Sequence, residues 1–159
     1  MPTPKGNSKV SAGLLMVRRG VAGWEFLLAH PGGPFFARKD EGSWSIPKGL
    51  PENGEDLLAA AKREFVEETG FACERERYLP LGSVTQAGGK VVHAWAFEGD
   101  CEPAELKSNS FTREWPPRSG RTREFPEIDR VAFFDAATAR SKLNPSQGAF
   151  IERALALLG

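Results

Sequence analysis

The segment from Gly49 to Phe71, GLPENGEDLLAAAKREFVEETGF, constrains this chain most, because it combines a turn, a helix and a cluster of acids. Glu64, Glu67 and Glu68 are spaced at i, i+3 and i+4, so a helix places them on one face. Like charges on one face repel each other, which disfavours such a helix in isolation. A divalent cation held by carboxylate oxygens offsets that repulsion. The segment therefore predicts a helix whose acidic face is either solvated or binds a metal ion.

The ends of this helix are also encoded locally. Asn53 is the predicted N-cap, with Asp56 three residues later in an arrangement like a capping box. Gly70 is the predicted C-cap, because glycine readily adopts the left-handed conformation that ends a helix. A second face, expected to pack on a sheet, carries Leu58, Ala61 and Phe65.

The remaining periodicity predicts an α/β protein with a mixed β-sheet. Short apolar or alternating runs predict strands over residues 10–18, 24–30, 77–86, 90–98, 110–115 and 130–134. Helices are predicted over residues 136–143 and 146–158, and the last has an apolar stripe of Phe150, Ala154, Leu157 and Leu158. Strands on both sides of the acidic helix, with a helix at the C-terminus, indicate an α/β/α sandwich.

The complete spacing of the acidic segment resembles the Nudix box, which is written G-x5-E-x7-R-E-U-x-E-E-x-G-U with U a bulky apolar residue. Every fixed position is matched, by Gly49, Glu55, Arg63, Glu64, Phe65, Glu67, Glu68, Gly70 and Phe71. The resemblance implies the Nudix fold with its loop-helix-loop catalytic motif at residues 49–71. It also implies hydrolysis of a nucleoside diphosphate linked to another group, by water attack on phosphorus with Mg²⁺ or Mn²⁺.

The resemblance assigns roles to the residues of the box. Glu64, Glu67, Glu68 and the Gly49 carbonyl are the implied metal ligands, and glycine at position 49 lets the backbone turn this carbonyl toward the metal. Glu55, Arg63 and Gly70 are the implied structural supports, with Arg63 orienting the acids.

Three carboxylates are candidates for the catalytic base. Glu67, inside the box, is the first choice. Glu127 is the candidate outside the box, since it precedes an aromatic-rich strand (VAFF) as an extra acid does in the diadenosine tetraphosphate hydrolase branch. Glu124 is a weaker competitor.

The expected substrates follow from the same resemblance. The run Trp-Ser-Ile-Pro-Lys-Gly leading into the box is similar to diadenosine polyphosphate hydrolases, and the whole chain resembles a bacterial group of predicted NTP pyrophosphohydrolases. Dinucleoside polyphosphates or nucleoside triphosphates are therefore the expected substrates. Oxidised nucleotides, nucleotide sugars, ADP-ribose, diphosphoinositol polyphosphates and capped RNA remain alternatives, as does a Nudix module that senses a nucleotide without cleaving it.

Substrate contacts are expected from cations and aromatic residues near the box. Solvated surface charge is the alternative for the cations, and a core position is the alternative for the tryptophans. Three arginines lie in a proline- and glycine-rich loop over residues 116–123, where guanidinium groups suit phosphate oxygens. The predicted substrate-binding residues are Lys48, Trp44, Arg38, Lys90, Arg118 and Arg121. The aromatic candidates for base stacking are Phe35, Trp44, Trp95 and Trp115.

The overall composition limits the remaining function classes. The 159 residues suit one domain, predicted over residues 9–159 after a flexible tail over residues 1–8. The formal net charge is zero, so no stable nucleic-acid partner is expected, and a monomer or homodimer is predicted. The N-terminus lacks the apolar stretch of a secretory signal and no apolar run approaches a membrane span, so a cytoplasmic location is expected.

Overall fold

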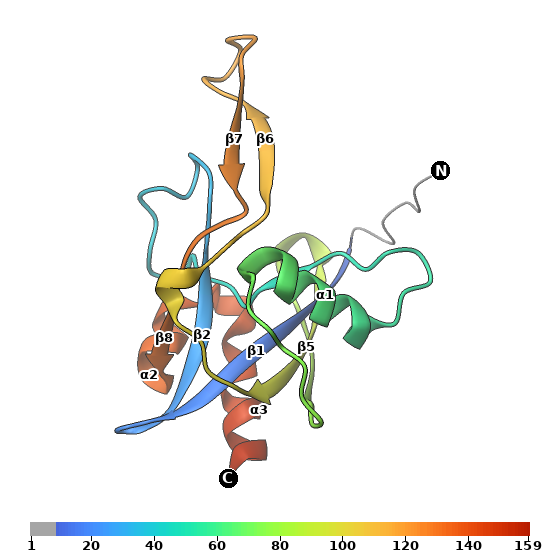
Figure 1. Cartoon of the computed structure of the whole chain (residues 1–159), viewed down its shortest axis with the longest axis vertical. Helices are drawn as coiled ribbons and strands as arrows, with labels where there is room; N and C mark the ends of the chain where they lie inside the picture. Colours follow the sequence, from blue (N-terminus) through green and yellow to red (C-terminus); the bar gives the residue numbers. More distant parts are fainter. Residues whose placement is uncertain (1–8) are drawn as a thin grey trace.

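The computed structural model describes residues 9–159 and is built around one six-stranded sheet (Figure 1). The predicted tail, residues 1–8, lies outside the described residues. Five strands run side by side in the order β4-β5-β1-β2-β8, and β3 pairs with β1. The β1–β5 pair is parallel and the other pairs are antiparallel, which confirms the mixed sheet. The strands are β1 (Val10–Gly20), β2 (Gly23–Pro31), β3 (Lys48–Gly49), β4 (Leu79–Thr85), β5 (Val91–Glu98) and β8 (Ile128–Asp135).

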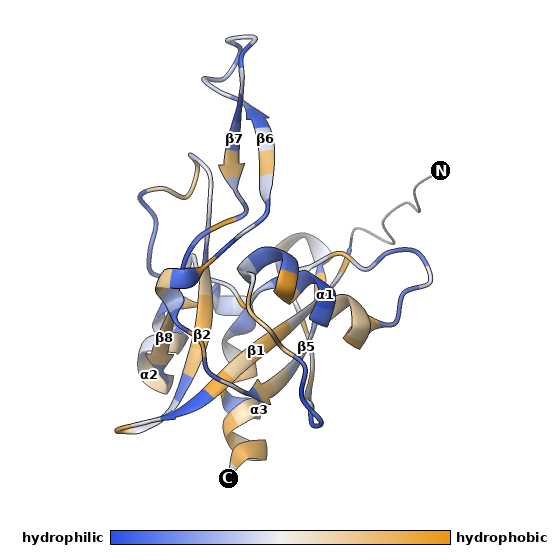
Figure 2. Cartoon of the chain, viewed as in Figure 1, coloured by the Kyte–Doolittle hydropathy of each residue, from blue (hydrophilic) through white to orange (hydrophobic). Residues whose placement is uncertain are grey.

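Helices cover both faces of this sheet. One face packs against α1 (Leu57–Thr69), and the other packs against α2 (Ala136–Lys142) and α3 (Gly148–Leu158). Strand β1 supplies side chains to both sides, and Figure 2 shows the middle of the central strands as hydrophobic. The predicted α/β/α sandwich is thereby confirmed. Short 3₁₀ turns occupy Ala87–Gly89, Pro103–Glu105 and Pro145–Gln147.

The ends of α1 confirm one predicted cap and correct the other. Gly70 is the C-cap, with φ +75° and its N–H donated to Val66 O. The N-cap is Asp56, whose carboxylate accepts the Ala59 N–H at 3.1 Å, so the prediction of Asn53 was wrong. The chain makes a separate turn before the helix, closed by the Glu55 N–H and Glu52 O at 2.9 Å. This turn uses Asn53, so the helix begins one turn later.

The apolar faces of the helices agree largely with their sequence patterns. Ala61 and Phe65 are fully buried under α1, next to the half-buried Leu58. In α3, Phe150 and Ala154 are buried as predicted. Leu157, however, is 48% exposed, and the prediction that it belongs to the core was wrong. Its place is taken by the buried Ile151, because the face of α3 that meets the sheet is rotated away from Leu157.

A two-stranded hairpin projects from the body of the fold (Figure 1). It consists of β6 (Ser110–Glu114) and β7 (Thr122–Pro126), joined by a turn at its outer end. The sequence predicted β6 but assigned residues 116–123 to a loop and did not predict β7. The run TREFP alternates too briefly to be distinguished from a loop, and its pairing with β6 is what defines it as a strand.

None of the helices within residues 9–159 is long and apolar enough to cross a membrane.

The C-cap of α1 generates a stability prediction. Gly70 and Gly54 both have positive φ, at +75° and +80°. A Cβ atom at residue 70 would lie 2.9 Å from Lys107 Cβ, whereas residue 54 has open space around it. Gly54→Ala should therefore lower the free energy of unfolding by about 1–2 kcal/mol, the cost of a left-handed alanine. Gly70→Ala should cost at least about 1 kcal/mol more, as measured by urea denaturation. Equal losses for the two variants would contradict the role assigned to the Lys107 contact.

Candidate functional site

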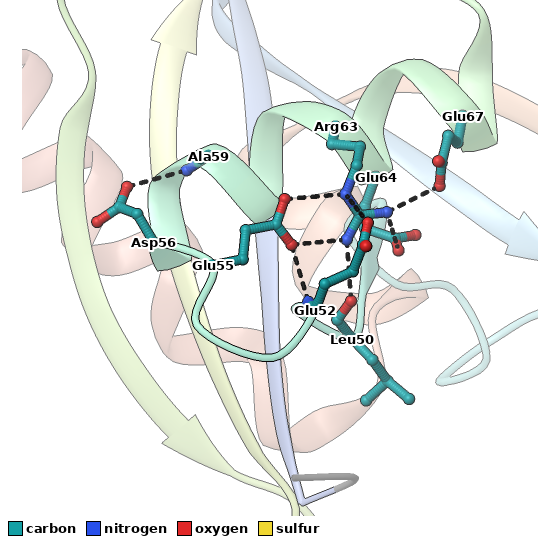
Figure 3. A network of polar contacts seen from close by, with 8 residues as sticks. All are labelled: Leu50, Glu52, Glu55, Asp56, Ala59, Arg63, Glu64 and Glu67. Atoms are coloured by element: carbon teal, nitrogen blue, oxygen red, sulfur yellow. Dashed lines mark hydrogen bonds and ion pairs between the residues drawn. The ribbon is translucent and has the colours of Figure 1, made fainter. Parts of the chain in front are cut away.

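Arg63 lies at the centre of the polar network on α1 (Figure 3). Its Nε and Nη2 groups donate to the two carboxylate oxygens of Glu55, each at 2.9 Å. Its Nη1 group donates to Glu64 at 2.9 Å and to Glu67 at 3.1 Å. Nη2 also donates to Leu50 O at 3.1 Å, which fixes the guanidinium to the loop before the helix. Arg63 therefore connects the loop and two acids of the helix, as expected of a residue that orients them.

Glu55 completes the support of this loop. Its Oε1 atom accepts the backbone N–H of Glu52 at 2.9 Å, in addition to the paired bonds from Arg63. The Glu55 carboxylate is the main cause of the raised pKa of Arg63, and burial of the guanidinium partly offsets it. Forked arginine–carboxylate pairs are short and directional, so this pair holds the turn and the helix in one relative position.

Three acids of the box, Glu64, Glu67 and Glu68, line one pocket of about 590 Å³, called here the acidic pocket. The wall combines acids with basic side chains at the same opening, and it includes every implied metal ligand together with the outside candidate for the base. The charged or metal-ligand positions on this wall are Gly49, Glu64, Glu67, Glu68, Glu127, Lys48 and Lys90. Residues from β3, α1, the turn before β5 and the junction between β7 and β8 thus meet in space.

Asn109 joins the outside acid to the helix. Its backbone N–H donates to Glu67 O at 3.0 Å, and its carbonyl accepts the N–H of Glu127 at 2.8 Å. Asn109, Ser11 and Gln86 line the acidic pocket, and the sequence analysis did not predict them. Single uncharged polar residues in strands and loops have no spacing pattern, so no sequence signal identified them.

Gly49 is required by the close approach of Glu64. It lies in β3 opposite Ala12 of β1, and a Cβ atom there would be 2.1 Å from Glu64 Cδ. Glu64 is buried, with 6% of the residue exposed, against this position. The glycine at position 49 therefore leaves room for the Glu64 carboxylate. The sequence by itself explains this glycine only by the freedom of its backbone to turn.

Burial changes the ionisation of several groups in the pocket. Burial, together with the charge of Glu64, raises the pKa of Glu68 to about 8. The same two causes, in the same order, raise the pKa of Glu127. Burial lowers the pKa of Lys48, although Glu68 partly offsets this change. The Lys48 N–H donates to Glu68 Oε1 at 3.3 Å. The pocket thus holds acids whose charge is poorly solvated, a condition that a bound cation would relieve.

The donor atoms of this pocket fit a hard divalent cation in kind. They are carboxylate and carbonyl oxygens, which suit Mg²⁺ or Mn²⁺ better than Zn²⁺. Within residues 9–159, however, no three His, Cys, Asp or Glu side chains are already gathered closely enough to hold an ion. Two of the acids, Glu64 and Glu67, are instead bonded to Arg63.

Four predicted substrate-binding residues lie away from the acidic pocket. Trp44 is 3% exposed, packs edge-on against Phe134 in the core and donates its indole N–H to Asp40 at 2.7 Å. Its predicted contact with substrate is therefore wrong, because the ring is covered by the fold. The other three are exposed: Arg38 lies in the loop after β2, and Arg118 and Arg121 lie at the outer end of the β6–β7 hairpin (Figure 1).

The Arg63 network generates a second prediction. Arg63→Lys removes the forked bonds to Glu55, since a lysine offers a point charge in place of a planar donor. We expect it to lower the free energy of unfolding by about 1–3 kcal/mol in urea denaturation. The control is Arg140→Lys, whose partner is the exposed Glu152, where a change below about 0.5 kcal/mol is expected. A loss no larger than the control's would contradict the supporting role of Arg63.

Structural comparison finds the same fold in characterised proteins. A C. elegans Ap4A hydrolase, solved as a binary complex, superposes with a TM-score of 0.65 at 20% identity. The match covers 93% of this chain and 97% of that one. At this identity the likeness establishes the fold alone.

Sequence comparison finds close similarity over a short stretch. An mRNA-decapping protein, g5R, of African swine fever virus is 57% identical over 37 residues, which is 23% of this chain and 15% of that protein. An RNA pyrophosphohydrolase of Dinoroseobacter shibae is 51% identical over 37 residues, or 23% of each chain. The matched stretches thus span less than a quarter of these relatives' own lengths.

The model of one protein family matches nearly the whole chain. It is described as the NUDIX domain, and it matches residues 7–154. The match includes the acidic segment, the strands of the central sheet and most of α3. Together with the fold and the complete box, it identifies this chain as a member of the Nudix family.

Proposed function

We propose that this chain hydrolyses a phosphoanhydride bond in nucleoside diphosphate-X substrates, with a divalent metal ion. Dinucleoside polyphosphates such as diadenosine tetraphosphate, or nucleoside triphosphates, are the favoured substrates. The observation that carries the proposal is the acidic pocket, in which the box acids, Glu127, Lys48 and Lys90 lie together. Hydrolysis of a polyphosphate needs negative charge to be neutralised and a water molecule to lose a proton, and this pocket has residue types for both tasks.

The metal ion would be held by Glu64, Glu67, Glu68 and the Gly49 carbonyl. When bound, it supplies neutralisation of phosphate charge and polarisation of the bond to be cleaved. Mg²⁺ or Mn²⁺ is proposed because all these donors are oxygen atoms. Arg63 positions Glu64 and Glu67 from the side, through the two bonds described above.

The remaining charged groups have distinct proposed tasks. Lys48 and Lys90 bind phosphate oxygens as point charges at the pocket wall. A carboxylate accepts the proton of the attacking water while the new bond to phosphorus forms and the anhydride bond breaks, so that the departing phosphate takes the bonding electrons. Glu67 is our first choice for this base, and Glu127 is the second. Burial raises the pKa of Glu127, which brings the pKa closer to physiological pH. A base whose pKa lies near the operating pH transfers protons most effectively.

Other substrates share this chemistry and remain alternatives. They are oxidised nucleotides, nucleotide sugars, diphosphoinositol polyphosphates and the capped or triphosphorylated ends of RNA. The two relatives whose names refer to RNA match only a 37-residue stretch each. They therefore support the type of reaction more than they support RNA as the substrate. A nucleotide sensor without catalysis is also an alternative, and the complete set of box acids argues against it.

Product analysis tests the proposal directly. The protein is incubated with diadenosine tetraphosphate and excess Mg²⁺, and the products are separated by ion-exchange chromatography. ATP and AMP in equal amounts, absent when EDTA is added, are the expected products of asymmetric cleavage by one water molecule. Intact substrate would contradict the favoured substrate, and the same assay would then be applied to nucleoside triphosphates, nucleotide sugars and diphosphoinositols. Binding without turnover of any of them would favour the sensor.

Substitution of the first-choice base gives a sharper test. Glu67→Gln should lower kcat by about 10²–10⁴-fold, since the amide neither accepts the proton nor carries charge. The fold should be retained, because the side chain is half-exposed and makes one bond to Arg63. Glu74→Gln, an exposed acid paired with Lys62, is the matched control and should leave kcat unchanged. Turnover near the wild-type rate in Glu67→Gln would transfer the role to Glu127, to be checked with Glu127→Gln.

The proposed phosphate contacts separate two groups of cations. Lys90 lines the acidic pocket, whereas Arg121 lies at the outer end of the hairpin. Lys90→Ala should raise KM by about 5- to 20-fold, the loss of one charge-assisted hydrogen bond. Arg121→Ala should leave KM within about 2-fold of the wild type. A larger rise in KM for Arg121→Ala than for Lys90→Ala would support the predicted binding of distal phosphates by the loop over residues 116–123. It would also contradict the proposed phosphate contact of Lys90.

A further inference from the structure

A second pocket, of about 360 Å³, lies between the segment after β2 and the β6–β7 hairpin. It is called here the aromatic pocket, because its wall includes Phe35, Phe36 and Phe111 together with Arg113. Glu127 belongs to the walls of both this pocket and the acidic pocket. The two pockets are therefore neighbours, separated by a carboxylate that the proposed function places beside the reacting phosphate.

Two glycines allow the segment after β2 to lie against the hairpin. The Gly32 N–H donates to Glu127 O at 2.9 Å, and a Cβ atom at this position would be 1.9 Å from Pro126 O. Gly33 has φ +94°, and a Cβ atom there would be 2.9 Å from the Phe111 ring. Larger residues would push the two walls apart. The aromatic pocket is thus built where two backbone segments pack closely together.

The aromatic side chains of this pocket are unusually exposed for their size. Phe35 is 53% exposed and Phe36 is 37% exposed. The Phe35 ring meets the edge of Trp115 at 5.7 Å, and the Arg113 guanidinium lies 4.8 Å from the centre of the same ring. Large exposed apolar groups in a hollow commonly mark a ligand site. Here they offer flat faces for stacking beside a cation with several hydrogen-bond donors.

We propose that the aromatic pocket binds the nucleobase end of the substrate, an inference that rests on the proposed function. The base stacks on Phe35, and Arg113 donates to polar atoms of the base or its sugar. The phosphate chain passes Glu127 into the acidic pocket, where Lys48 and Lys90 lie. Stacking requires a planar π-system and tolerates any base, so this pocket selects nucleotides as a class.

The same argument ranks the alternative substrates. A diphosphoinositol or an inorganic polyphosphate matches the acidic pocket but has no flat face to place on Phe35. A dinucleoside polyphosphate or a nucleoside triphosphate matches both pockets at once. The aromatic pocket therefore favours nucleotide substrates over phosphate esters of aliphatic rings.

Equilibrium binding of two simple ligands tests this subsite apart from catalysis. ADP and inorganic pyrophosphate both carry a diphosphate, and only ADP carries a base. Isothermal titration calorimetry with Mg²⁺ should show ADP binding about 5- to 150-fold more tightly than pyrophosphate, the range for one stacked base. Phe35→Ala should reduce that ratio toward one by weakening ADP alone, and Phe35→Trp should retain it. Leu157→Ala, which removes another half-exposed apolar side chain at the end of α3, is the control and should not alter the ratio.

Each contrary outcome has a distinct meaning. If ADP binds no more tightly than pyrophosphate, the proposed subsite is overturned and the proposed function stands. The same holds if Phe35→Ala retains the preference for ADP. Absence of binding by either ligand would overturn both. Dimers in sedimentation velocity that Phe35→Ala dissociates, with the ADP preference intact, would assign these aromatic residues to contact with a second copy of the chain and overturn the subsite.

Discussion

The forked pairing of Arg63 with Glu55 is the interaction on which the rest of the candidate site depends. It joins the turn before α1 to the first half of the helix, and the same guanidinium bonds Glu64 and Glu67. Without this cation, three carboxylates on one helical face would repel each other. The network therefore lets a helix carry more negative charge than its own sequence tolerates. Its Nη1 group bonds both Glu64 and Glu67, so it brings these two carboxylates together at one side of the helix.

The sheet supplies the second constraint, because it determines how closely the backbone approaches the acids. Strand β3 pairs with β1 at Gly49, and only glycine leaves space for the buried Glu64 carboxylate. Asn109 then connects the end of α1 to Glu127 through two backbone hydrogen bonds. Residues far apart in the chain are placed around one pocket by main-chain contacts, which are less sensitive to side-chain motion than contacts between long charged groups.

The hairpin extends this arrangement away from the reacting centre. Strand β6 contributes Phe111 and Arg113 to the aromatic pocket, whereas the turn at the outer end of the hairpin carries the arginines that the sequence suggested as phosphate contacts. A loop rich in arginine and glycine is an ambiguous signal, since solvated surface loops have the same composition. The pairing of β6 with β7 resolves it, because it moves Arg118 and Arg121 outward and brings an aromatic wall toward Glu127.

The sequence alone determined the family, the sandwich of helices around a mixed sheet, the C-cap at Gly70 and the acids that share one face of α1. These features follow from local spacing, since a helix of fixed period places i, i+3 and i+4 together in any fold. Only the tertiary structure decided that Trp44 belongs to the core, that Asp56 caps α1, and that Glu127 and Lys90 reach the acidic pocket. The physical reason is that burial and proximity depend on which distant segments pack together, and no local period encodes that pairing.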